Sequence, residues 1–328
     1  MPADGSTPAL GHERGPNVTT RPSPAAALGL MALSATLFAA MNLLARLATA
    51  SASWASTAAV RAAVGALVAL VLARLRGRSL AAKDRPALFW RSLLGTISML
   101  ATFYALSSRT LSLGNTVTLL NLAPVFLAVL APIFLHERTS GAVALAIALA
   151  LAGVVLVVRP AFLFGGGLEQ VVTSGSSSGP SSTVTALVAV LAALSTSIAM
   201  MFLRRVGKTE SAEAIAFHFS VFAAVTMGLI SLFDLRVPTL EGALCMVGAG
   251  LCAGFAQLAM TRAYALEQAA RVSGMSYFSV VASALFGATL LDERPGPTAI
   301  AGMTLVIVGG LVVTFARSRA APEVPSRP

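Results

Sequence analysis

A pattern of two apolar runs around a short charged hinge occurs twice in the chain, and it constrains the fold more than any other feature. The first copy reads NLAPVFLAVLAPIFL-HER-TSGAVALAIALALAGVVLVV over 121–158. The second copy, about 156 residues later, reads YFSVVASALFGATLL-DER-PGPTAIAGMTLVIVGGLVVTF. Glu137 thereby aligns with Glu293, and Gly153 aligns with Gly309. A repeat of this kind indicates a chain built from two related halves.

The apolar runs are too long and too many for one soluble core. Hydrophobic residues make up 56% of the chain and charged residues 11%, whereas a soluble domain carries about 25% charged residues. Ten runs are each long enough to span a bilayer as a helix of about 18–25 residues, and they cover 27–48, 55–74, 88–108, 113–135, 141–158, 184–203, 212–233, 242–264, 270–291 and 297–316. No alternating pattern of barrel strands is present. The predicted fold is an all-α polytopic membrane protein with ten transmembrane helices.

The runs divide into two groups of five around a Gly/Ser-rich segment. We expect a disordered cytoplasmic N-terminal tail, a first five-helix repeat, a flexible linker, a second five-helix repeat and a cytoplasmic C-terminal tail. Their predicted bounds are 1–25, 26–158, 159–183, 184–317 and 318–328.

The basic residues predict the orientation of the helices. If the N-terminus is cytoplasmic, the inside segments hold 17 Lys and Arg residues and the outside segments hold 5, which is the positive-inside bias. Both termini are then cytoplasmic, and the expected location is the inner (plasma) membrane. The net charge of +10 is placed in these loops, so no nucleic-acid partner is expected. Because each half has an odd number of helices, the second half enters the membrane from the opposite side, which makes an inverted repeat typical of secondary transporters.

Three stretches carry a family resemblance: FWRSLLGTISMLATFYAL (89–106), NTVTLLNLAPVFLAVLAPIFLHER (115–138) and FSVVASALFGATLLDER (278–294). Together with the ten-helix plan, they resemble the EamA-like domain of the drug/metabolite transporter superfamily over 27–317. The resemblance implies a carrier of small metabolites and marks Glu137, Glu293, Gly153 and Gly309 as family positions, but it does not specify the substrate. The third run, with Arg91, Gly95 and Tyr104, is similar to carriers of organic anions and cofactor precursors.

Polar side chains at membrane depth are the candidates for a substrate site, because they are costly in lipid and usually face a cavity or a partner. Arg61 is the clearest, although it could instead extend to the outer interface. His218 is a candidate proton site, with a bond to a carbonyl of its own helix as the alternative. We interpret the two as equivalent positions of the repeats. The substrate-binding candidates, each of which could alternatively join helices, are Asn42, Arg61, Tyr104, Asn121, Gln257, Tyr264 and Tyr277.

A second set of residues is expected to shape the backbone. Pro124 removes the amide that would bond the carbonyl of Leu120, and so predicts a kink. Glu137 and Glu293 are predicted to accept backbone amides at the start of the helices that follow them, where the helix dipole favours an anion. Gly153 and Gly309 complete the predicted hinge set.

No Asp or Glu falls in the middle of a run, and no Walker A or HExxH motif is present. We therefore expect no catalytic residues, no metal and no cofactor, and we do not expect an enzyme. The predicted function is a secondary transporter that moves a small polar or amphipathic metabolite, such as an organic anion or an amino acid derivative, by alternating access. An intramembrane enzyme or a channel remains the alternative. The expected partners are a small-molecule substrate and the lipid bilayer, and a homodimer stays open, as do the direction and the coupling of transport.

Overall fold

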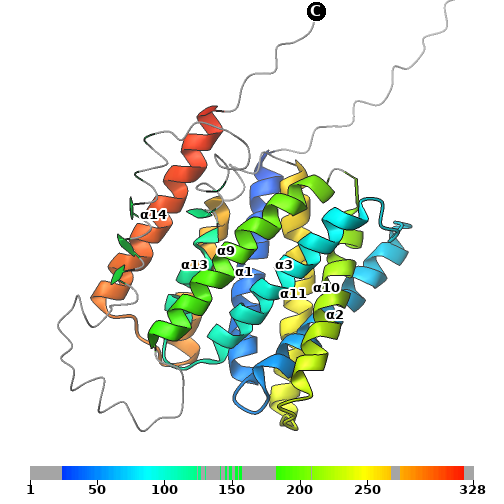
Figure 1. Cartoon of the computed structure of the whole chain (residues 1–328). Helices are drawn as coiled ribbons and strands as arrows, with labels where there is room; N and C mark the ends of the chain where they lie inside the picture. The colour runs from blue at the N-terminus through cyan, green and yellow to red at the C-terminus, as the bar shows by residue number, and fades with distance from the viewer. Residues whose placement is uncertain are drawn as a thin grey trace, which may run out of the picture.

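The computed structural model describes residues 24–123, 182–207, 209–266 and 274–320, with isolated positions between 125 and 156 (Figure 1). All regular structure in these residues is helical, which confirms the all-α prediction. The elements are α1 (Pro24–Ala48), α2 (Trp54–Leu75), α3 (Arg85–Ser107), α4 (Leu113–Leu120), α9 (Ser182–Val206), α10 (Ala212–Ser231), α11 (Leu240–Leu266), the 3-10 helix η1 (Gly274–Tyr277), α13 (Phe278–Leu290) and α14 (Pro297–Ala320).

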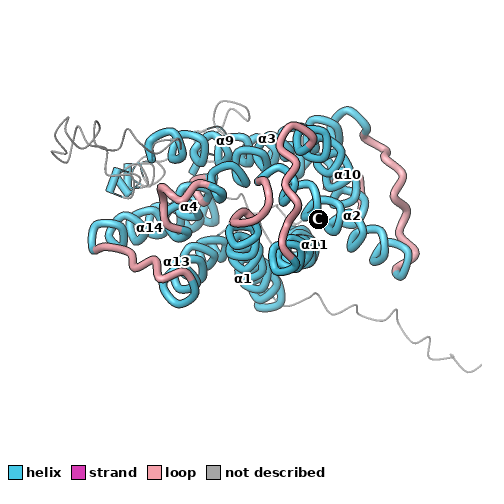
Figure 2. The backbone as a smooth tube through the Cα atoms, turned by 90° about the horizontal axis from the view of Figure 1, so that it is seen from below, coloured by secondary structure: helices cyan, strands magenta, loops and turns pink. Residues whose placement is uncertain are grey.

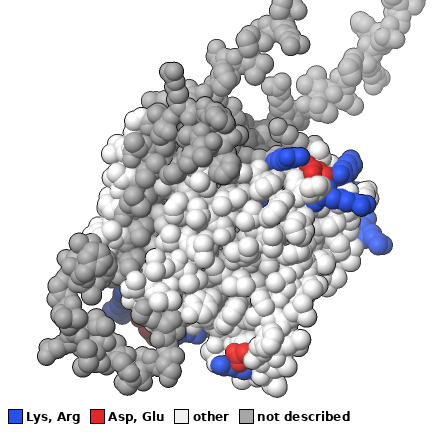
Figure 3. All heavy atoms as spheres, viewed as in Figure 1, with Lys and Arg blue, Asp and Glu red and all other residues white. Residues whose placement is uncertain are grey.

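Five of these helices, α1, α2, α9, α10 and α11, are long and apolar enough to cross a membrane. Figure 3 shows charged side chains gathered towards the two ends of the bundle, with an uncharged belt between them. Both observations support the predicted membrane protein. Pro124 and Glu137 lie outside the described residues, as does most of both predicted tails, of the linker and of the fifth run. The structure begins α1 two residues before the predicted end of the N-terminal tail, includes 182–183 of the predicted linker in α9, and continues α14 to residue 320.

Serine side chains set the start of two equivalent helices. The Ser53 Oγ accepts the Ser56 amide before α2, and the Ser211 Oγ accepts the Ala214 amide before α10, each at 3.1 Å. Such caps satisfy amides that have no partner in the first turn of a helix. The two serines are 158 residues apart. The structure thus gives an equivalence between the repeats that is independent of hydropathy.

The two repeats run in opposite directions through one bundle. In Figure 1, α1 descends from the end of the bundle at which α14 finishes, whereas its equivalent α9 ascends towards that end. We call this end the terminal face, which also holds the α2–α3 and α9–α10 connections, and the opposite end the distal face. The opposed directions of α1 and α9 agree with the predicted inversion.

Helix contacts follow the same inverted symmetry. The helix α1 packs along α11, and its equivalent α9 packs along α3, which is the equivalent of α11. The helices α2 and α10 pack on each other (Figure 2). The repeats are therefore interleaved rather than placed side by side.

Two hydrogen bonds show this symmetry at the level of single residues. Ser34 Oγ of α1 donates to the carbonyl of Ala256 in α11 at 2.8 Å, and Ser98 Oγ of α3 donates to the carbonyl of Ala192 in α9 at 3.0 Å. Ala192 lies 158 residues after Ser34, and Ala256 lies 158 residues after Ser98. The two bonds thus join the same pair of repeat positions, with donor and acceptor exchanged.

Glycines allow the closest helix approaches. A Cβ at Gly250 would lie 2.5 Å from the Cβ of Val64, and one at Gly254 would lie 2.9 Å from the Cβ of Val68. This GxxxG face of α11 is therefore filled by α2 of the same chain, which is the packing role of such a motif. Gly153, predicted as a structural glycine, is buried against α14, where a Cβ would meet the carbonyl oxygen of Gly302 at 2.7 Å. Gly309 lies buried within α14.

Candidate functional site

Two buried arginines lie against one aromatic ring in the interior of the helix bundle. Arg61 of α2 is 7% exposed and Arg91 of α3 is 4% exposed. Their guanidinium carbons lie 6.0 Å and 4.7 Å from the ring centroid of Phe219 in α10. The two carbons are therefore at most 10.7 Å apart, the sum of these distances. We call Arg61, Arg91 and Phe219 the paired-arginine site.

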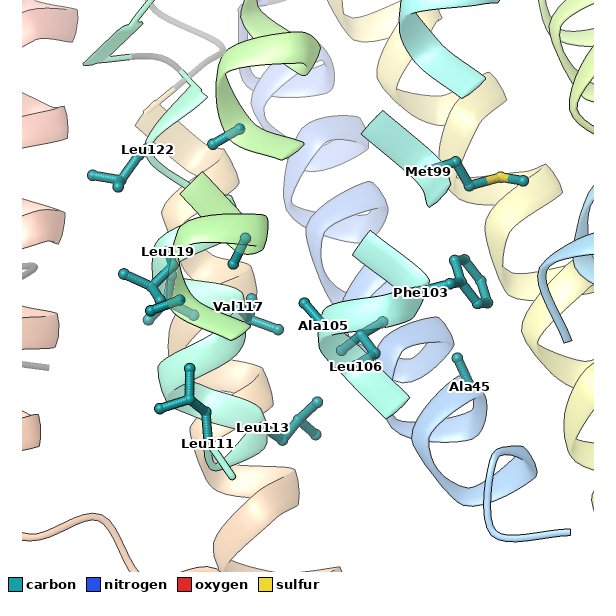
Figure 4. Packing of buried hydrophobic residues seen from close by; sticks show 14 of the residues in the cluster. Ala45, Met99, Phe103, Ala105, Leu106, Leu111, Leu113, Val117, Leu119 and Leu122 are labelled. Atoms are coloured by element: carbon teal, nitrogen blue, oxygen red, sulfur yellow. The ribbon is translucent and has the colours of Figure 1, made fainter. Parts of the chain in front are cut away.

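The α3 helix supplies the remaining wall of the site. Arg61 Nη1 lies 2.9 Å from the thioether sulfur of Met99, and Figure 4 shows Met99 and Phe103 projecting from α3 on the side away from Val117 and Leu119 of α4. A Cβ on Gly95 would clash with the Arg91 guanidinium and would lie 2.9 Å from the ring carbon Cε2 of Phe219. The missing side chain of this glycine therefore leaves the room in which the second arginine folds against the ring.

The charges in this site have no acidic partner among the described residues. None of their carboxylates forms an ion pair with Arg61 or Arg91 within 4.0 Å. The Nε of both arginines and Nη1 of Arg91 are buried without a hydrogen-bond partner. Unpaired buried charges and donors are unfavourable in a medium of low polarity. The arrangement leaves donors free to bind an anion.

The structure revises the predicted equivalence of Arg61 and His218. Because the capping serines Ser53 and Ser211 are 158 residues apart, Arg61 corresponds to Phe219 rather than to His218. The hydropathy of the two runs did not define their first residues, which produced an error of one position. Equivalent positions of the repeats thus contact each other where α2 crosses α10.

His218 lies beside the site but does not enter its contacts. Its Nδ1 is 2.9 Å from the carbonyl oxygen of Ala214, one turn earlier in α10, which is the helix-carbonyl alternative considered from the sequence. Its ring stands edge-on to the Phe217 ring, with centroids 5.7 Å apart.

Two other candidates carry buried polar atoms without partners. Asn42 in α1 is 6% exposed, and its Oδ1 has no hydrogen-bond partner. Gln257 in α11 is 7% exposed, and its Nε2 has none. Because α1 packs along α11, these groups add polar atoms to the interior of the bundle beyond the paired-arginine site.

Three of the remaining candidates have contacts within the protein. The Asn121 side-chain amide donates to the Val117 carbonyl at 2.9 Å and to Ser279 Oγ at 3.1 Å, which joins α4 to α13. Tyr277 is 2% exposed and belongs to the main apolar cluster. The Tyr104 ring stands edge-on to the Trp54 ring at 6.0 Å. Tyr264 lies in α11, and its side chain is outside the described residues.

Glu293 has a different partner from the one predicted. Its Oε2 accepts the amide of Leu113, the first residue of α4, at 2.6 Å, and its Oε1 lies 2.7 Å from Nη2 of the buried Arg46 in α1. The predicted bonds to the following helix, α14, were wrong because the chain turns back at Asp292, where φ is +53°. The Glu293 amide then donates to the Gly287 carbonyl, which points its side chain at the start of α4.

A polar cavity of about 270 Å³ opens beside this ion pair at the distal face. Its lining includes Arg46, Arg109, Ser112, Asn115, Glu293 and Arg294. Three arginines against one glutamate give the cavity a positive charge.

At the terminal face, Arg76 Nη1 pairs with Glu213 Oε1 at 2.6 Å, and Glu210 accepts the amides of Lys83 and Asp84 at 2.5 and 2.9 Å. Ion pairs and bonds thus tie the helices at both ends of the bundle.

The sequence candidates did not include Arg91 or Arg46, although both lie in helices that the sequence predicted. Each stands about 9 Å or less from a helix end at a rise of 1.5 Å per residue, where a charge is easily assigned to the interface. The sequence feature that could have identified both arginines is a charged residue in an apolar run that has no acidic residue within one helical turn.

Comparisons with known proteins agree with this architecture. The pseudopaline exporter CntI of Pseudomonas aeruginosa is 26% identical over 286 residues, which are 87% of this chain and 94% of that protein. Solute carrier family 35 member G1 of Mus musculus is 29% identical over 71% of this chain and 63% of its own length. A solved crystal structure with 20% identity covers 92% of this chain and all of its own, with a TM-score of 0.64, and supports the fold alone.

The family model of the EamA-like transporters matches twice, over residues 25–159 and 183–315. The two matches correspond to the two halves that the helix contacts relate by inversion. The chain therefore belongs to the EamA-like transporter family.

Proposed function

We propose that the protein is a secondary carrier that moves a small polar or amphipathic metabolite across the inner membrane by alternating access. The observation that carries this proposal is the inverted pairing of helix contacts, α1 with α11 and α9 with α3. Two interleaved repeats of opposite direction can exchange their arrangements, and a central site then opens to one face and then to the other.

The polar interior supports a carrier rather than a purely structural bundle. Arg61, Asn42 and Gln257 come from both repeats, and each carries a buried polar atom without a partner. A buried polar atom without a hydrogen-bond partner is unfavourable unless a ligand forms a hydrogen bond with it. In this proposal they line the substrate path, and His218 is the candidate proton site.

The similarity to an exporter and to a solute carrier favours transport over the other functions of inverted-repeat bundles. The bias of basic residues towards the loops of the terminal face supports a cytoplasmic position for that face. The distal cavity with its three arginines then opens on the outer side, where it would meet anionic solutes first.

The test uses the purified full-length protein in proteoliposomes. A thermal-shift screen against a metabolite library first identifies ligands, since a ligand stabilises the state that it binds. Counterflow of a labelled hit should then saturate and should be accelerated by unlabelled hit on the far side. Flux that is fast and does not saturate would instead indicate a channel, and chemical conversion of the hit without a gradient would indicate an enzyme.

A pH series of the same counterflow assay tests His218. If it carries the coupled proton, His218→Gln flattens the pH profile between about pH 5 and 8. An unchanged pH profile would mean that His218 does not carry the coupled proton, and its hydrogen bond with the Ala214 carbonyl would then be its role in the structure.

A further inference from the structure

We propose that the paired-arginine site binds the anionic part of the transported metabolite, and that this part carries two negative charges, as in a phosphate monoester or a short dicarboxylate. This inference rests on the proposed carrier function and names the substrate class that the site selects. Its elements are the guanidinium groups of Arg61 and Arg91, placed by α2 and α3 against the ring of Phe219.

The first argument is the charge. Two cations within 10.7 Å of each other are buried together, and the described residues supply no carboxylate within ion-pair distance. The negative face of an aromatic ring attracts a cation, but one ring shared by two guanidinium groups does not neutralise either of them. A ligand with two negative charges would neutralise both guanidinium groups.

The second argument is the contrast with another buried arginine of the same chain. Arg46 is 1% exposed, and its Nη2 bonds both the Glu293 carboxylate and the Leu111 carbonyl, although its Nε and Nη1 are buried without a partner. That is how a buried arginine with a structural role is stabilised. Arg61 and Arg91 have only a thioether and a ring as described contacts, so their charges do not hold helices together in this way.

The third argument is the arrangement of donors. Nε of Arg61 and both Nε and Nη1 of Arg91 are buried and have no hydrogen-bond partner. Guanidinium groups bind carboxylate and phosphate oxygens with two parallel bonds. The guanidinium carbons of the two forks lie at most 10.7 Å apart, within the span that a phosphate or a dicarboxylate of a few carbons can bridge.

The experiment measures binding to the full-length protein in nanodiscs at constant ionic strength. The probes are phenylphosphonate, benzoate and benzamide, which share a ring and differ mainly in charge. Thermal unfolding at increasing probe concentration gives the affinity of each. Phenylphosphonate should bind at least about 10-fold more tightly than benzoate, and benzamide should not shift the unfolding temperature.

Variants assign the binding to the site. Arg61→Gln and Arg91→Gln should each weaken phenylphosphonate binding at least about 10-fold, whereas Arg74→Gln, the same change at an exposed position of α2, should leave it unchanged. Without ligand, each of the two site variants should unfold at a higher temperature than the wild type, because one of two buried like charges is gone. A structural arginine predicts the opposite shift.

Equal affinity of phenylphosphonate and benzoate, or a loss of stability in both ligand-free variants, would overturn the inference. Counterflow separates its failure from that of the carrier function. If the protein transports neutral or cationic hits without a preference for dianions, the proposed substrate class is wrong and the carrier function still holds. If it binds dianions tightly but shows no counterflow, the binding site is supported and the carrier function is wrong.

Discussion

Removing the charge of Glu293 should destabilise the protein far more than removing a charge from an exposed ion pair of the same face. Glu293 makes a 2.7 Å contact with Arg46, whose side chain is 2% exposed, and it accepts the first amide of α4. In Glu293→Gln, the amide oxygen can still accept from Leu113, but Arg46 is left as an uncompensated buried charge.

The magnitude follows from the burial of the pair. Loss of one partner of a fully buried pair costs about 3–5 kcal/mol. The Glu293 side chain is 19% exposed, so part of its charge is hydrated, and we expect a cost of about 2–3 kcal/mol for Glu293→Gln. Glu293→Ala also removes the acceptor of the Leu113 amide, which adds about 1 kcal/mol.

The assay is unfolding in mixed detergent micelles at fixed composition, followed by far-UV circular dichroism. The matched control is Asp234→Asn, which breaks the 3.0 Å pair with Arg236, whose side chains are 48% and 63% exposed. This control should cost less than about 1 kcal/mol. In addition, Arg46→Gln combined with Glu293→Gln should cost less than the sum of the two single changes. If Glu293→Gln costs no more than Asp234→Asn, the Arg46–Glu293 pair does not stabilise the distal end of the bundle.

Three further outcomes follow from the described contacts. Gly250→Ala should lower stability by about 1–3 kcal/mol, measured by the same unfolding assay, since its Cβ would overlap a valine of α2; full stability would mean that α2 can shift. Asn121→Ala and Ser279→Ala should each destabilise the protein by about 1 kcal/mol and show non-additive effects together, since the two side chains bond each other; additive losses would mean that the bond is not made in the membrane. Single cysteines at Ser79 and Val237, in a background without the native cysteines, should react with an impermeant maleimide from the cytoplasmic and the outer side respectively; labelling from one side would contradict the predicted orientation.

Much of the fold could be predicted from the sequence, because spans of apolar residues have few alternatives to a transmembrane helix. The residue-by-residue alignment of the two repeats was harder to predict from the sequence. Hydropathy locates a run to within a few residues, whereas the start of α2 is fixed by Ser53 and the start of α10 by Ser211. Reading these serines as caps would have paired Arg61 with Phe219.

The site was only partly predicted, for a related reason. Arg61 is deep enough in its run to be noticed, but Arg91 stands near the start of α3 and reaches Phe219 through its long side chain and the space at Gly95. Glu293 was correctly placed at the end of a span, yet its partners Arg46 and Leu113 lie 247 and 180 residues away in the chain. No local pattern encodes contacts of that range.

The exchanged serine bonds have a consequence for the ancestry of the chain. Ser34 and Ser98 both belong to the first repeat, yet each bonds an alanine of the second repeat at the position that is equivalent to the other serine. A single five-helix polypeptide that carried both serines would therefore form these bonds twice, if two copies entered the membrane in opposite orientations. Gene duplication and fusion would convert such a dual-topology dimer into this chain without any new helix contact. The same reasoning implies that the halves, expressed as separate polypeptides cut between 159 and 183, would find each other in the bilayer, because neither half alone can cover the faces that α1 and α3 present.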